Sequence, residues 1–545
     1  MDGNRKTYNE SLLAIINDTS KFKLLDGDIT VKREGQLQRL LRKLKKDGVI
    51  DSNIYPQIYP SGSRPARLYG LPKIHKCKFD NEIPPFRPIV SSIGAYNYNL
   101  SKYLSNLLKP HIPMTHCTQD TFSFVKEINQ VRTNDLFFVS YDVVSLFTNI
   151  PLKDTIELAV DYVIKNNPNL KLTKGDLNKL FHIATAQTHF LFNGAYYDQI
   201  DGVAMGSPLA PVLANLYLGH HEQKWLKDYK GVSPVFYKRY VDDVIALFNN
   251  PEEAELFLGY LNQQNNSIKF TMEEENNHKI AFLDVLVDNT GDKIRTSVYR
   301  KKTFTGVLTN YLSFTCFSYK LSLVRCLIDR AYKINNTWLG FHSDISGICD
   351  FLKKNLYPES LLSKTVKAYL NKKLGENEGK NNIVEVVNVR YFKLPYIGEY
   401  SKVCAKKLKK LCKTFCKEDT DIKLVFTAFK LARMFSTKDP VPKNLLSSVI
   451  YKFVCAGCES SYIGQTGRHI STRIKEHLST DKKSHVFKHL AKNANCKTST
   501  SDSCFSILDR ASTEYERKVK EGLYIGWEKP ELNRQKFHLF STLGL

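Results

Sequence analysis

The chain has 545 residues, enough for about three or four domains, and its 79 Lys and Arg against 55 Asp and Glu give a net charge of +24. This excess favours a polyanionic partner and predicts binding that depends on salt. No secretory signal and no apolar run long enough to cross a membrane occur, so we expect an intracellular protein without a membrane partner. The 12 cysteines are then expected to be reduced, not joined in a disulfide framework.

The first part of the chain, residues 1–60, is basic and helix-prone. We predict a packed helix here, because leucines recur at helical spacing, at Leu37, Leu40, Leu41 and Leu44. Residues 61–285 then alternate strand-like and helix-like runs. Their first part is basic and rich in turns, in the runs Arg67–Lys76 and Arg87–Ser91.

Carboxylates interrupt two apolar, β-branched runs further along. Val139–Phe147 contains Asp142, and Tyr240–Val244 contains Asp242 and Asp243. Burying such charge is costly unless a cation compensates it. An Asp pair at a turn with a third Asp on a distant strand suits two Mg²⁺ (or Mn²⁺) ions, which would activate a 3′-hydroxyl and stabilise a leaving pyrophosphate. A simple hairpin turn is the alternative.

Between these runs lies Gly202–Pro211, with Met205, Gly206 and Ser207 at its centre. Gly206 would let the backbone approach a base or phosphate closely, and Pro208 suits the first turn of a helix. The order of the three motifs resembles the palm of reverse transcriptases. The resemblance implies that the three aspartates hold the catalytic ions and that the Met205–Ser207 segment supports the template and the incoming nucleotide.

The same resemblance implies roles for three further residues. Phe147, five residues after Asp142, would be the steric gate against a ribose 2′-hydroxyl; an ordinary core Phe is the alternative. Lys73 and Arg87 would contact the triphosphate, since a lysine charge and an arginine fork both suit phosphate. A solvated basic loop is the alternative for both.

Downstream, Ile268–Glu273 and Phe282–Val285 are interpreted as two more palm strands. Residues 286–370 are interpreted as a thumb with a helix over Tyr319–Ile334. The basic side chains of this helix could track a duplex minor groove or simply be solvated; they are Lys320, Arg325 and Arg330.

Residues 371–445 are predicted to be a basic linker with a flexible break over 375–382. A lysine cluster in it could serve nuclear import, nucleic-acid contact or plain solvation, and consists of Lys406, Lys407, Lys409 and Lys410. The nearby Cys404, Cys412 and Cys416 are expected to be packing residues or free thiols.

Residues 446–545 combine a predicted β-hairpin with two helices. Tyr451 and Tyr462 lie on its strands, Arg473 and His477 share one helix face, and Glu521 follows later. Together such side chains can deprotonate a water, hold one Mg²⁺ through the carboxylate and neutralise a phosphorane. A small module with buried tyrosines is the alternative.

This spacing resembles the GIY-YIG nuclease family. The resemblance implies that Tyr451 and Tyr462 are its paired tyrosines, Arg473 its phosphate-stabilising arginine and Glu521 its metal ligand. It also implies an assisting role for His477, and a structural or catalytic one for Asn533. The chain departs from the motif at Val449, where the family has Gly.

Cys455 and Cys458 form a C-x2-C pair on the turn between the two tyrosine strands, a good half-site for zinc. His489 and Cys496 are one choice for the second half, with His485 as a spare ligand. Two free thiols on a turn are the alternative.

Together these features resemble the layout of Penelope-like retroelement proteins, from about Asp18 to the C-terminus. The resemblance implies a multidomain α/β (α+β) fold, a right-hand fingers-palm-thumb reverse transcriptase followed by a small α/β GIY-YIG nuclease domain. It implies a nuclear RNA-directed DNA polymerase that binds template RNA, target and product DNA and dNTPs, with an endonuclease that nicks the target to prime synthesis. The family usually has a longer N-terminal helical region, so we expect a truncated copy.

Two other functions are open at this point, and so is the oligomeric state. A decayed or domesticated nucleic-acid-binding copy is disfavoured because decay would not be expected to spare Asp142, Asp242 and Asp243 together. A telomerase-like polymerase is disfavoured by the attached nuclease.

Overall fold

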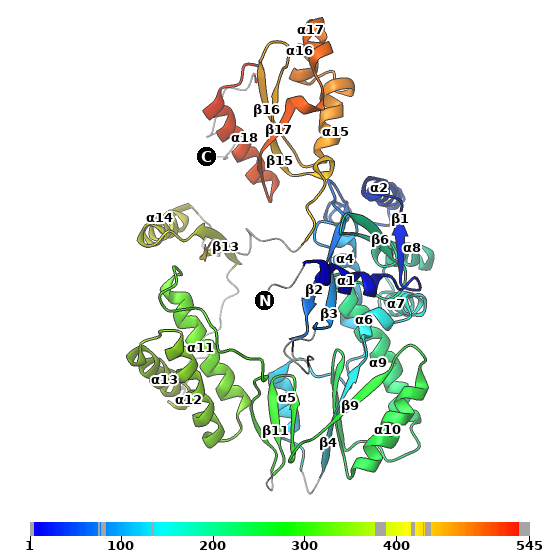
Figure 1. Ribbon diagram of the computed structural model, residues 1–545, viewed down its shortest axis with the longest axis vertical. Coiled ribbons are helices and arrows are strands. Elements are labelled where there is room, and N and C mark those ends of the chain that lie inside the picture. Colours follow the sequence, from blue (N-terminus) through cyan, green and yellow to red (C-terminus); the bar gives the residue numbers. More distant parts are fainter. Residues whose placement is uncertain are drawn as a thin grey trace. The chain divides into compact units, whose positions relative to one another are not determined.

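The computed structural model is mixed α/β and forms two compact units, each built from separate stretches of the chain (Figure 1). It describes residues 5–74, 77, 83–132, 136–290, 293–375, 388–415, 420–428, 430 and 438–533. Unit 1 comprises Met1–Pro113, Ser145–His221 and Thr437–Leu545; unit 2 comprises Met114–Val144 and Glu222–Ser436.

The main sheet of unit 1 has five strands in the order β1-β6-β5-β2-β3, and only β2 and β5 pair in parallel. Its strands are β1 (Phe22–Leu25), β2 (Ala66–Pro72), β3 (Phe86–Ser91), β5 (Thr188–Phe192) and β6 (Ala195–Gln199). The surrounding helices are α1 (Arg5–Ile16), α2 (Thr30–Lys46), α3 (Tyr55–Ile58), α4 (Tyr98–Leu108), η2 (Lys109–His111), α6 (Leu146–Asn149), α7 (Leu152–Asn166) and α8 (Lys174–Ala184). Helix α9 (Ala210–Asp228) begins in unit 1 and ends in unit 2.

The predicted helix in residues 1–60 is confirmed as α2, which buries Leu37, Leu41 and Leu44 at helical spacing. The β2–β3 hairpin packs its inner residues on α1, in a core that includes Leu12, Leu68 and Val90. The sequence pattern therefore identifies the N-terminal elements correctly.

A second, smaller sheet in unit 1 has the order β16-β15-β17 (Figure 1). It is built from β15 (Val449–Val454), β16 (Ser461–Thr466) and β17 (Phe505–Arg510). The helices of this module are η4 (Lys443–Leu445), α15 (Ile470–Lys475), the single π-helical turn η5 (Glu476–Thr480), α16 (His485–Lys492), α17 (Ala494–Ser499), η6 (Asp502–Cys504) and α18 (Glu514–Glu528). Helices α15 and α18 pack on opposite faces, since Ile474 joins Tyr451 in one core cluster and Ile525 joins Ile450 in another. The hairpin predicted for the two tyrosine strands is confirmed by the antiparallel β15–β16 pairing.

The central sheet of unit 2 has the order β7-β8-β4-β9, all antiparallel. Its strands are β4 (Phe137–Val143), β7 (Phe236–Tyr240), β8 (Asp243–Phe248) and β9 (Phe270–Glu274), beside a second sheet of β10 (Lys279–Phe282), β11 (Val285–Asp288) and β12 (Arg295–Val298). The helices of unit 2 include α5 (Thr121–Ile128), α10 (Pro251–Gln264), α11 (Phe317–Ile334), α12 (Trp338–Lys354) and α13 (Glu359–Leu374). One core joins the two sheets and α5 through residues such as Phe138, Phe282 and Phe124.

Two expectations for this unit need correction. Phe282–Val285 does not form a strand: it is the tight turn between β10 and β11, with Leu283 in the left-handed region at a φ of 57°. The stretch 371–445 is more than a linker, because it contains a strand–helix–strand unit of β13 (Asn388–Pro395), α14 (Glu399–Phe415) and β14 (Thr420–Thr427). Of the predicted flexible break, residues 376–382 lie outside the described residues, as does Cys416.

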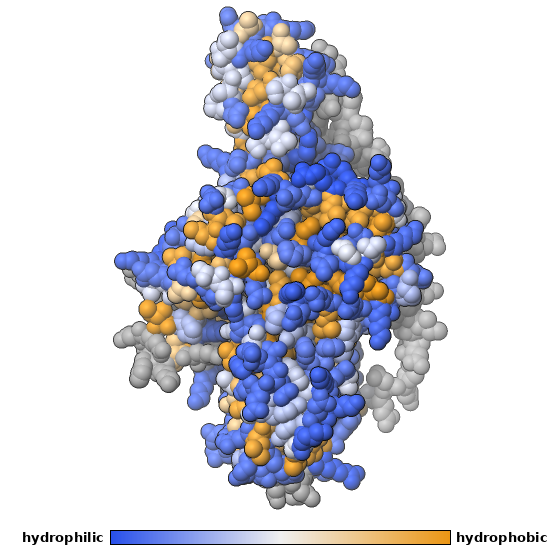
Figure 2. Space-filling model, turned by 90° about the vertical axis from the view of Figure 1, so that its right-hand side faces the viewer, coloured by the Kyte–Doolittle hydropathy of each residue, from blue (hydrophilic) through white to orange (hydrophobic). Residues whose placement is uncertain are grey.

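Hydrophilic residues cover most of the molecular face shown in Figure 2, with hydrophobic residues in smaller groups between them. None of the helices in the described part of the chain combines the length and hydrophobicity that a membrane-spanning helix requires.

Candidate active sites and metal centre

The three aspartates predicted to bind metal ions lie at one end of the central sheet of unit 2. Asp142 on β4 is the register partner of Asp243 on β8, which places their Cβ atoms about 5 Å apart on one face. The N–H of Val143 donates to the carbonyl oxygen of Asp242 at 3.0 Å, so the turn that carries Asp242 closes against the end of β4. All three aspartates are half-buried. This cluster of carboxylate oxygens fits hard cations such as Mg²⁺.

The turn between β7 and β8 is strained at Val241, which has a φ of 58°. A β-branched residue is rarely found in the left-handed region, because its Cβ substituents crowd the backbone there. Arg239 opposes the strain: its Nη1 donates to the carbonyl oxygen of Val241 at 3.0 Å. The position of Asp242, one residue later, therefore depends on this arginine.

Arg239 is in turn held by a buried ion pair with Glu222 on α9. Its Nε donates to Glu222 Oε1 at 3.0 Å, and the Tyr237 hydroxyl donates to the same oxygen at 2.6 Å. Burial, and next the Glu222 carboxylate, raise the pKa of Tyr237 well above its usual value, so its proton stays available for this bond. Sequence reasoning missed this network, since nothing in the chain between Glu222 and Arg239 indicates that they meet.

Replacing Arg239 with Lys should lower primer extension far more than it lowers stability. Lysine keeps the charge near Glu222 but lacks the fork that reaches Val241 as well. We expect loss of a positioned ligand to reduce extension on the order of a hundredfold. Extension rate and Tm are measured together, with the exposed Arg295→Lys on β12 as the matched control.

The double variant Glu222→Leu with Arg239→Met separates the two roles. Replacing a buried ion pair by apolar side chains is often neutral for stability. A double variant that melts like the wild type but extends poorly supports positioning, whereas wild-type extension contradicts it.

The candidate triphosphate contacts lie near the loop end of the β2–β3 hairpin in unit 1. Arg87 on β3 is exposed and pairs in register with Leu71, and the N–H of Lys73 donates to the carbonyl of Pro85 at 2.8 Å. Both cations thus extend from one hairpin, as a phosphate clamp would require.

The segment of Met205, Gly206 and Ser207 packs against β3. The N–H of Val90 donates to the Met205 carbonyl at 2.8 Å, and a Cβ on Gly206, whose φ is 116°, would lie 2.4 Å from the Val90 carbonyl oxygen. Glycine is required here by this backbone approach, and approach to a base or phosphate stays a prediction. Helix α9 begins at Ala210, two residues after Pro208.

Phe147 is half-buried on the short helix α6 in unit 1. Its carbonyl oxygen accepts a hydrogen bond from Val203 N–H at 2.7 Å, which places it beside the start of the Met205–Ser207 segment. It is not among the fully buried residues, so an ordinary core position and a gate both stay open for its ring.

Four of the predicted nuclease residues meet on one side of the β15–β16 hairpin. The Tyr451 hydroxyl lies 2.6 Å from Nε2 of His477, and Arg473 Nε donates to the same hydroxyl at 3.3 Å. The Tyr462 ring lies 6.4 Å from the Tyr451 ring and 5.6 Å from the His477 ring. Residues from the hairpin, α15 and the π-helical turn thus converge on one phenol.

The hydrogen bonds assign proton positions in this cluster. One neutral tautomer of His477 satisfies all three contacts: Nε2 accepts the phenol proton of Tyr451, whose oxygen accepts from Arg473, and Nδ1 donates to the Ser484 hydroxyl. Burial, with a smaller effect of Arg473, lowers the pKa of His477 to about 4, so the ring is neutral and able to accept a proton at pH 7. Ser484 is a second residue that sequence reasoning missed.

Glu521 on α18 interacts electrostatically with Arg473 and the two tyrosines of this cluster. Burial raises the pKa of this carboxyl to about 7, and Arg473 opposes the rise. Glu521 in turn contributes, after burial, to the raised pKa of Tyr462 and, more weakly, of Tyr451. A half-buried carboxylate beside two phenols and an arginine fits one divalent cation.

Arg473 also forms ion pairs, with Glu476 at 2.9 Å and Asp481 at 3.1 Å. These carboxylates orient the guanidinium, and neither was singled out from the sequence. The Asn533 side chain accepts from the Ile463 N–H and donates to the Ile463 carbonyl, both at 2.8 Å. These two bonds satisfy backbone groups at the edge of β16, so the contact is structural.

Two positions of the hairpin, Gly464 and Val449, show how its residues fit around Tyr451. Gly464 is the register partner of Tyr451, and a Cβ there would lie 2.6 Å from the Tyr451 hydroxyl, so only glycine leaves room for the phenol. Val449, where the nuclease motif has Gly, is fully buried and packs with Ile470. Its side chain is accommodated without displacing Tyr451.

The four residues considered for zinc come together. One ligand atom from each lies within 4.8 Å of those of the others, in the set Cys455, Cys458, His489 and Cys496. Three thiols and one imidazole at this spacing fit a tetrahedral Cys3His zinc site. Burial, followed by the neighbouring thiols, raises the pKa of Cys496 to about 11, a cost that a bound cation would remove. The spare ligand His485 instead lies 2.9 Å from the Leu532 carbonyl through its Nδ1.

If the four residues hold zinc, substituting Cys455 with Ser should release it and lower the melting temperature of the C-terminal module, residues 446–533. Cys455 is fully buried in a core cluster with Phe453 and Val486, so losing the metal would loosen that cluster. Metal content by mass spectrometry and Tm check this, with the half-buried Cys504→Ser as control. Purified protein without zinc, together with an unchanged Tm, would contradict the site.

The basic face expected on α11 is only partly available. Lys320 is buried, and its ammonium donates to the backbone carbonyls of Tyr311 and Ser313. Arg330 forms an ion pair with Asp284 in the β10–β11 turn. Duplex tracking by this helix stays a prediction for Arg325 alone.

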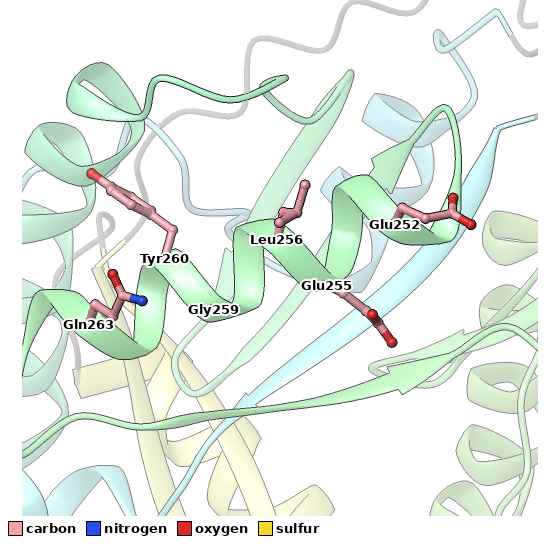
Figure 3. A pocket seen from close by; sticks show the side chains of 6 residues that line it. All are labelled: Glu252, Glu255, Leu256, Gly259, Tyr260 and Gln263. Atoms are coloured by element: carbon pink, nitrogen blue, oxygen red, sulfur yellow. The ribbon is translucent and has the colours of Figure 1, made fainter.

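A surface hollow on α10 holds none of the predicted site residues. Figure 3 shows that all six side-chain positions come from this one helix: Glu252, Glu255, Leu256, Gly259, Tyr260 and Gln263. We assign it no role.

Comparison with known families places the carboxylate cluster within a recognised polymerase domain. Residues 80–307 match the reverse transcriptase (RNA-dependent DNA polymerase) model, and residues 307–367 match the animal helix-turn-helix domain. The chain therefore contains a reverse transcriptase domain followed by an animal helix-turn-helix domain, in the region expected to be the thumb. A search of curated proteins finds no match.

Solved structures similar to this chain include two polymerase types. Apo telomerase from Candida tropicalis has 10% identity and a TM-score of 0.38, over 68% of this chain and 64% of that one. A foamy viral protease-reverse transcriptase in complex with double-stranded DNA has 13% identity and a TM-score of 0.28, over 61% of this chain and 47% of that one. The chain spans about 60% of the length of a C-terminally truncated Candida tropicalis telomerase, at 11% identity and a TM-score of 0.35.

Proposed function

We propose that this protein is the RNA-directed DNA polymerase of a Penelope-like retroelement, with a linked GIY-YIG endonuclease that nicks target DNA to prime synthesis in the nucleus. The polymerase part rests on the reverse transcriptase match and on one observation, the register pairing of Asp142 with Asp243 beside Asp242. The nuclease part rests on the cluster around the Tyr451 hydroxyl.

In the polymerase, Asp142, Asp242 and Asp243 would hold Mg²⁺ or Mn²⁺ ions, which lower the pKa of a 3′-hydroxyl and neutralise the leaving pyrophosphate. The chain's own contribution is placement. The β4–β8 ladder fixes Asp142 and Asp243, and Arg239 fixes the turn that carries Asp242. Lys73 and Arg87 would neutralise the triphosphate.

In the nuclease, Glu521 would hold one Mg²⁺, which activates water and stabilises the leaving oxygen. Tyr451 is placed to take a proton from the attacking water, and neutral His477 to take the phenol proton in turn. Arg473 would stabilise the charge on the phosphorane, held ready by Glu476 and Asp481.

A primer-extension assay on an RNA template, with and without Mg²⁺, tests the polymerase. A plasmid-nicking assay tests the nuclease, and a nicked plasmid with an RNA template tests their linkage. Extension from the nick by the wild type supports the whole proposal; extension without nicking leaves a polymerase alone and removes the endonuclease.

Changing Phe147 to Val should admit ribonucleotides if its ring excludes the 2′-hydroxyl. We expect the efficiency of rNTP over dNTP incorporation to rise on the order of tenfold to a hundredfold, since a steric contact discriminates by about that much. Single-nucleotide incorporation kinetics measure the ratio, with Phe147→Tyr as the control that keeps the ring. An unchanged ratio for Phe147→Val would exclude the gate.

A further inference from the structure

We propose that residues 388–415 and 420–427, here called the basic βαβ unit, form a binding surface for single-stranded RNA. Strands β13 and β14 pair in parallel, and α14 is the connection that parallel strands require. The family matches end at residue 367, so neither covers this unit. The choice of RNA as the partner rests on the proposed polymerase function.

The unit is folded and anchored within unit 2. The Ser401 hydroxyl donates to the Pro395 carbonyl at 2.8 Å and accepts from Ile397 N–H at 2.7 Å, which ties α14 to the end of β13. The hydroxyl of Tyr319 on α11 bonds both backbone groups of Phe426 on β14, at 2.8 and 3.1 Å. The surface is therefore held in place and is not a loose tail.

The two faces of the β13–β14 pair differ. One face carries Leu394, Leu424 and Phe426, all half-buried. Because side chains alternate along a strand, Tyr391 lies on the other face, in register with Lys423. Tyr391 is 68% exposed, so its ring is accessible to a base. Exposed Lys393 flanks it on the same face.

The charge of the unit suits a polyanion. The sequence from 388 to 427 contains ten Lys and Arg against four Asp and Glu. Glu399 is paired with Lys402 at 2.5 Å, and within the described chain no carboxylate forms an ion pair with four outward lysines of α14: Lys406, Lys407, Lys409 and Lys410.

Tyr391 shares its sheet face with the exposed Lys393 and Lys423, and an exposed aromatic flanked by lysines on a strand is the combination that binds single strands. Every base offers a ring face for stacking, while the lysines neutralise backbone phosphates without reading sequence. A duplex hides its base faces and cannot stack on Tyr391. The chemistry thus selects a single strand, and the template of an RNA-dependent polymerase is the long single strand this chain would need to hold.

The test is fluorescence anisotropy of full-length protein, without divalent cations, on labelled oligouridylate, on oligothymidylate of equal length and on duplex RNA. Lys406, Lys407, Lys409 and Lys410 are changed together to Gln. Each single-strand phosphate contact contributes about 0.7 to the slope of log K against log salt, so the slope should fall by up to about 3, with affinity at least about tenfold lower. Four exposed lysines of unit 1 changed to Gln are the matched control: Lys153, Lys165, Lys171 and Lys179.

The aromatic contribution is tested separately by Tyr391→Ala, with Tyr391→Phe as the variant that keeps the ring. Alanine should weaken oligouridylate binding about tenfold, also at high salt, and phenylalanine should leave it nearly unchanged. A four-lysine variant no weaker than its control, or equal binding by both Tyr391 variants, overturns the surface. Stronger effects on oligothymidylate than on oligouridylate overturn RNA as the partner.

Extension of a short preformed primer–template by the four-lysine variant should stay at the wild-type rate. This readout distinguishes the two proposals, because failure of the polymerase function would appear as no extension by the wild type itself.

Discussion

Replacing Asp242 with Asn should abolish Mg²⁺-dependent primer extension while the protein stays folded. Asn keeps the shape of the side chain but removes one negative ligand of the catalytic ions, and we expect a loss on the order of a thousandfold, about 4 kcal/mol in the barrier. Asp142→Asn should behave in the same way. Removing one of three neighbouring carboxylates also relieves repulsion, so Tm should not fall.

Extension kinetics, Tm and Mn²⁺ binding by electron paramagnetic resonance check this expectation. The matched control is Glu255→Gln. Glu255 is an exposed residue on α10 that lines the surface hollow of Figure 3. Extension within tenfold of wild type by either Asp variant would remove the carboxylate cluster from the mechanism.

Replacing Glu521 with Gln should abolish metal-dependent nicking and leave extension of a supplied primer near the wild-type rate. Glu521 is the charge that would hold the nuclease cation, and its loss should cost at least about a thousandfold in nicking. The C-terminal module, residues 446–533, has core clusters that contain only residues between Leu446 and Leu532. A change inside it should therefore leave the palm carboxylates undisturbed.

The matched control is Glu514→Gln on the first turn of the same helix, where the carboxylate pairs with Lys518 at 2.9 Å. It removes the same charge without touching the tyrosine cluster. Nicking by Glu521→Gln at the wild-type rate would exclude the proposed nuclease mechanism, and equal loss in both variants would point to a charge effect on DNA binding.

The nicking reaction should also depend on pH in a defined direction. Burial raises the pKa of Glu521 to about 7 from the value near 4.5 expected in the unfolded chain. Between these values the folded state holds the extra proton, so without metal this carboxyl lowers stability as pH rises. Metal binding needs the deprotonated form, so apparent affinity should increase as pH rises through about 7. Titrations of Mg²⁺-dependent nicking at several pH values measure this, and an affinity that is constant from pH 6 to 8 would contradict it.

Local patterns predicted the strands of both candidate sites. Asp142 lies near the end of one β-branched run and Asp243 at the start of another, and the structure makes them register partners. The two tyrosines lie on a predicted hairpin, and a four-residue spacing puts Arg473 and His477 on one face. These signals are readable because they depend on the period of one strand or one helix turn.

What the sequence did not predict depends on contacts between distant segments. Glu222 and Arg239 form a buried pair across two elements, and Ser484 meets His477 through a π-helical turn that no propensity indicates. The glycine at position 206 has the backbone of β3 as its neighbour, a contact that the sequence alone does not indicate. The lysine-rich composition of residues 371–445 gave no indication of a folded unit. Exposed charged side chains do not predict a two-stranded sheet with one helix.

The way the chain is divided has a consequence for how it folds. Unit 1 is assembled from three stretches of sequence, and Thr437–Leu545 joins Met1–Pro113 in it. Hydrogen bonds such as that between the Ser447 hydroxyl and the Gly62 carbonyl close a loop of nearly four hundred residues. Contacts of such long range slow folding, and the part of unit 1 made first leaves the ribosome long before its last partner exists. We therefore expect slow refolding and dependence on chaperones, in contrast to the local helical hairpins of α11, α12 and α13.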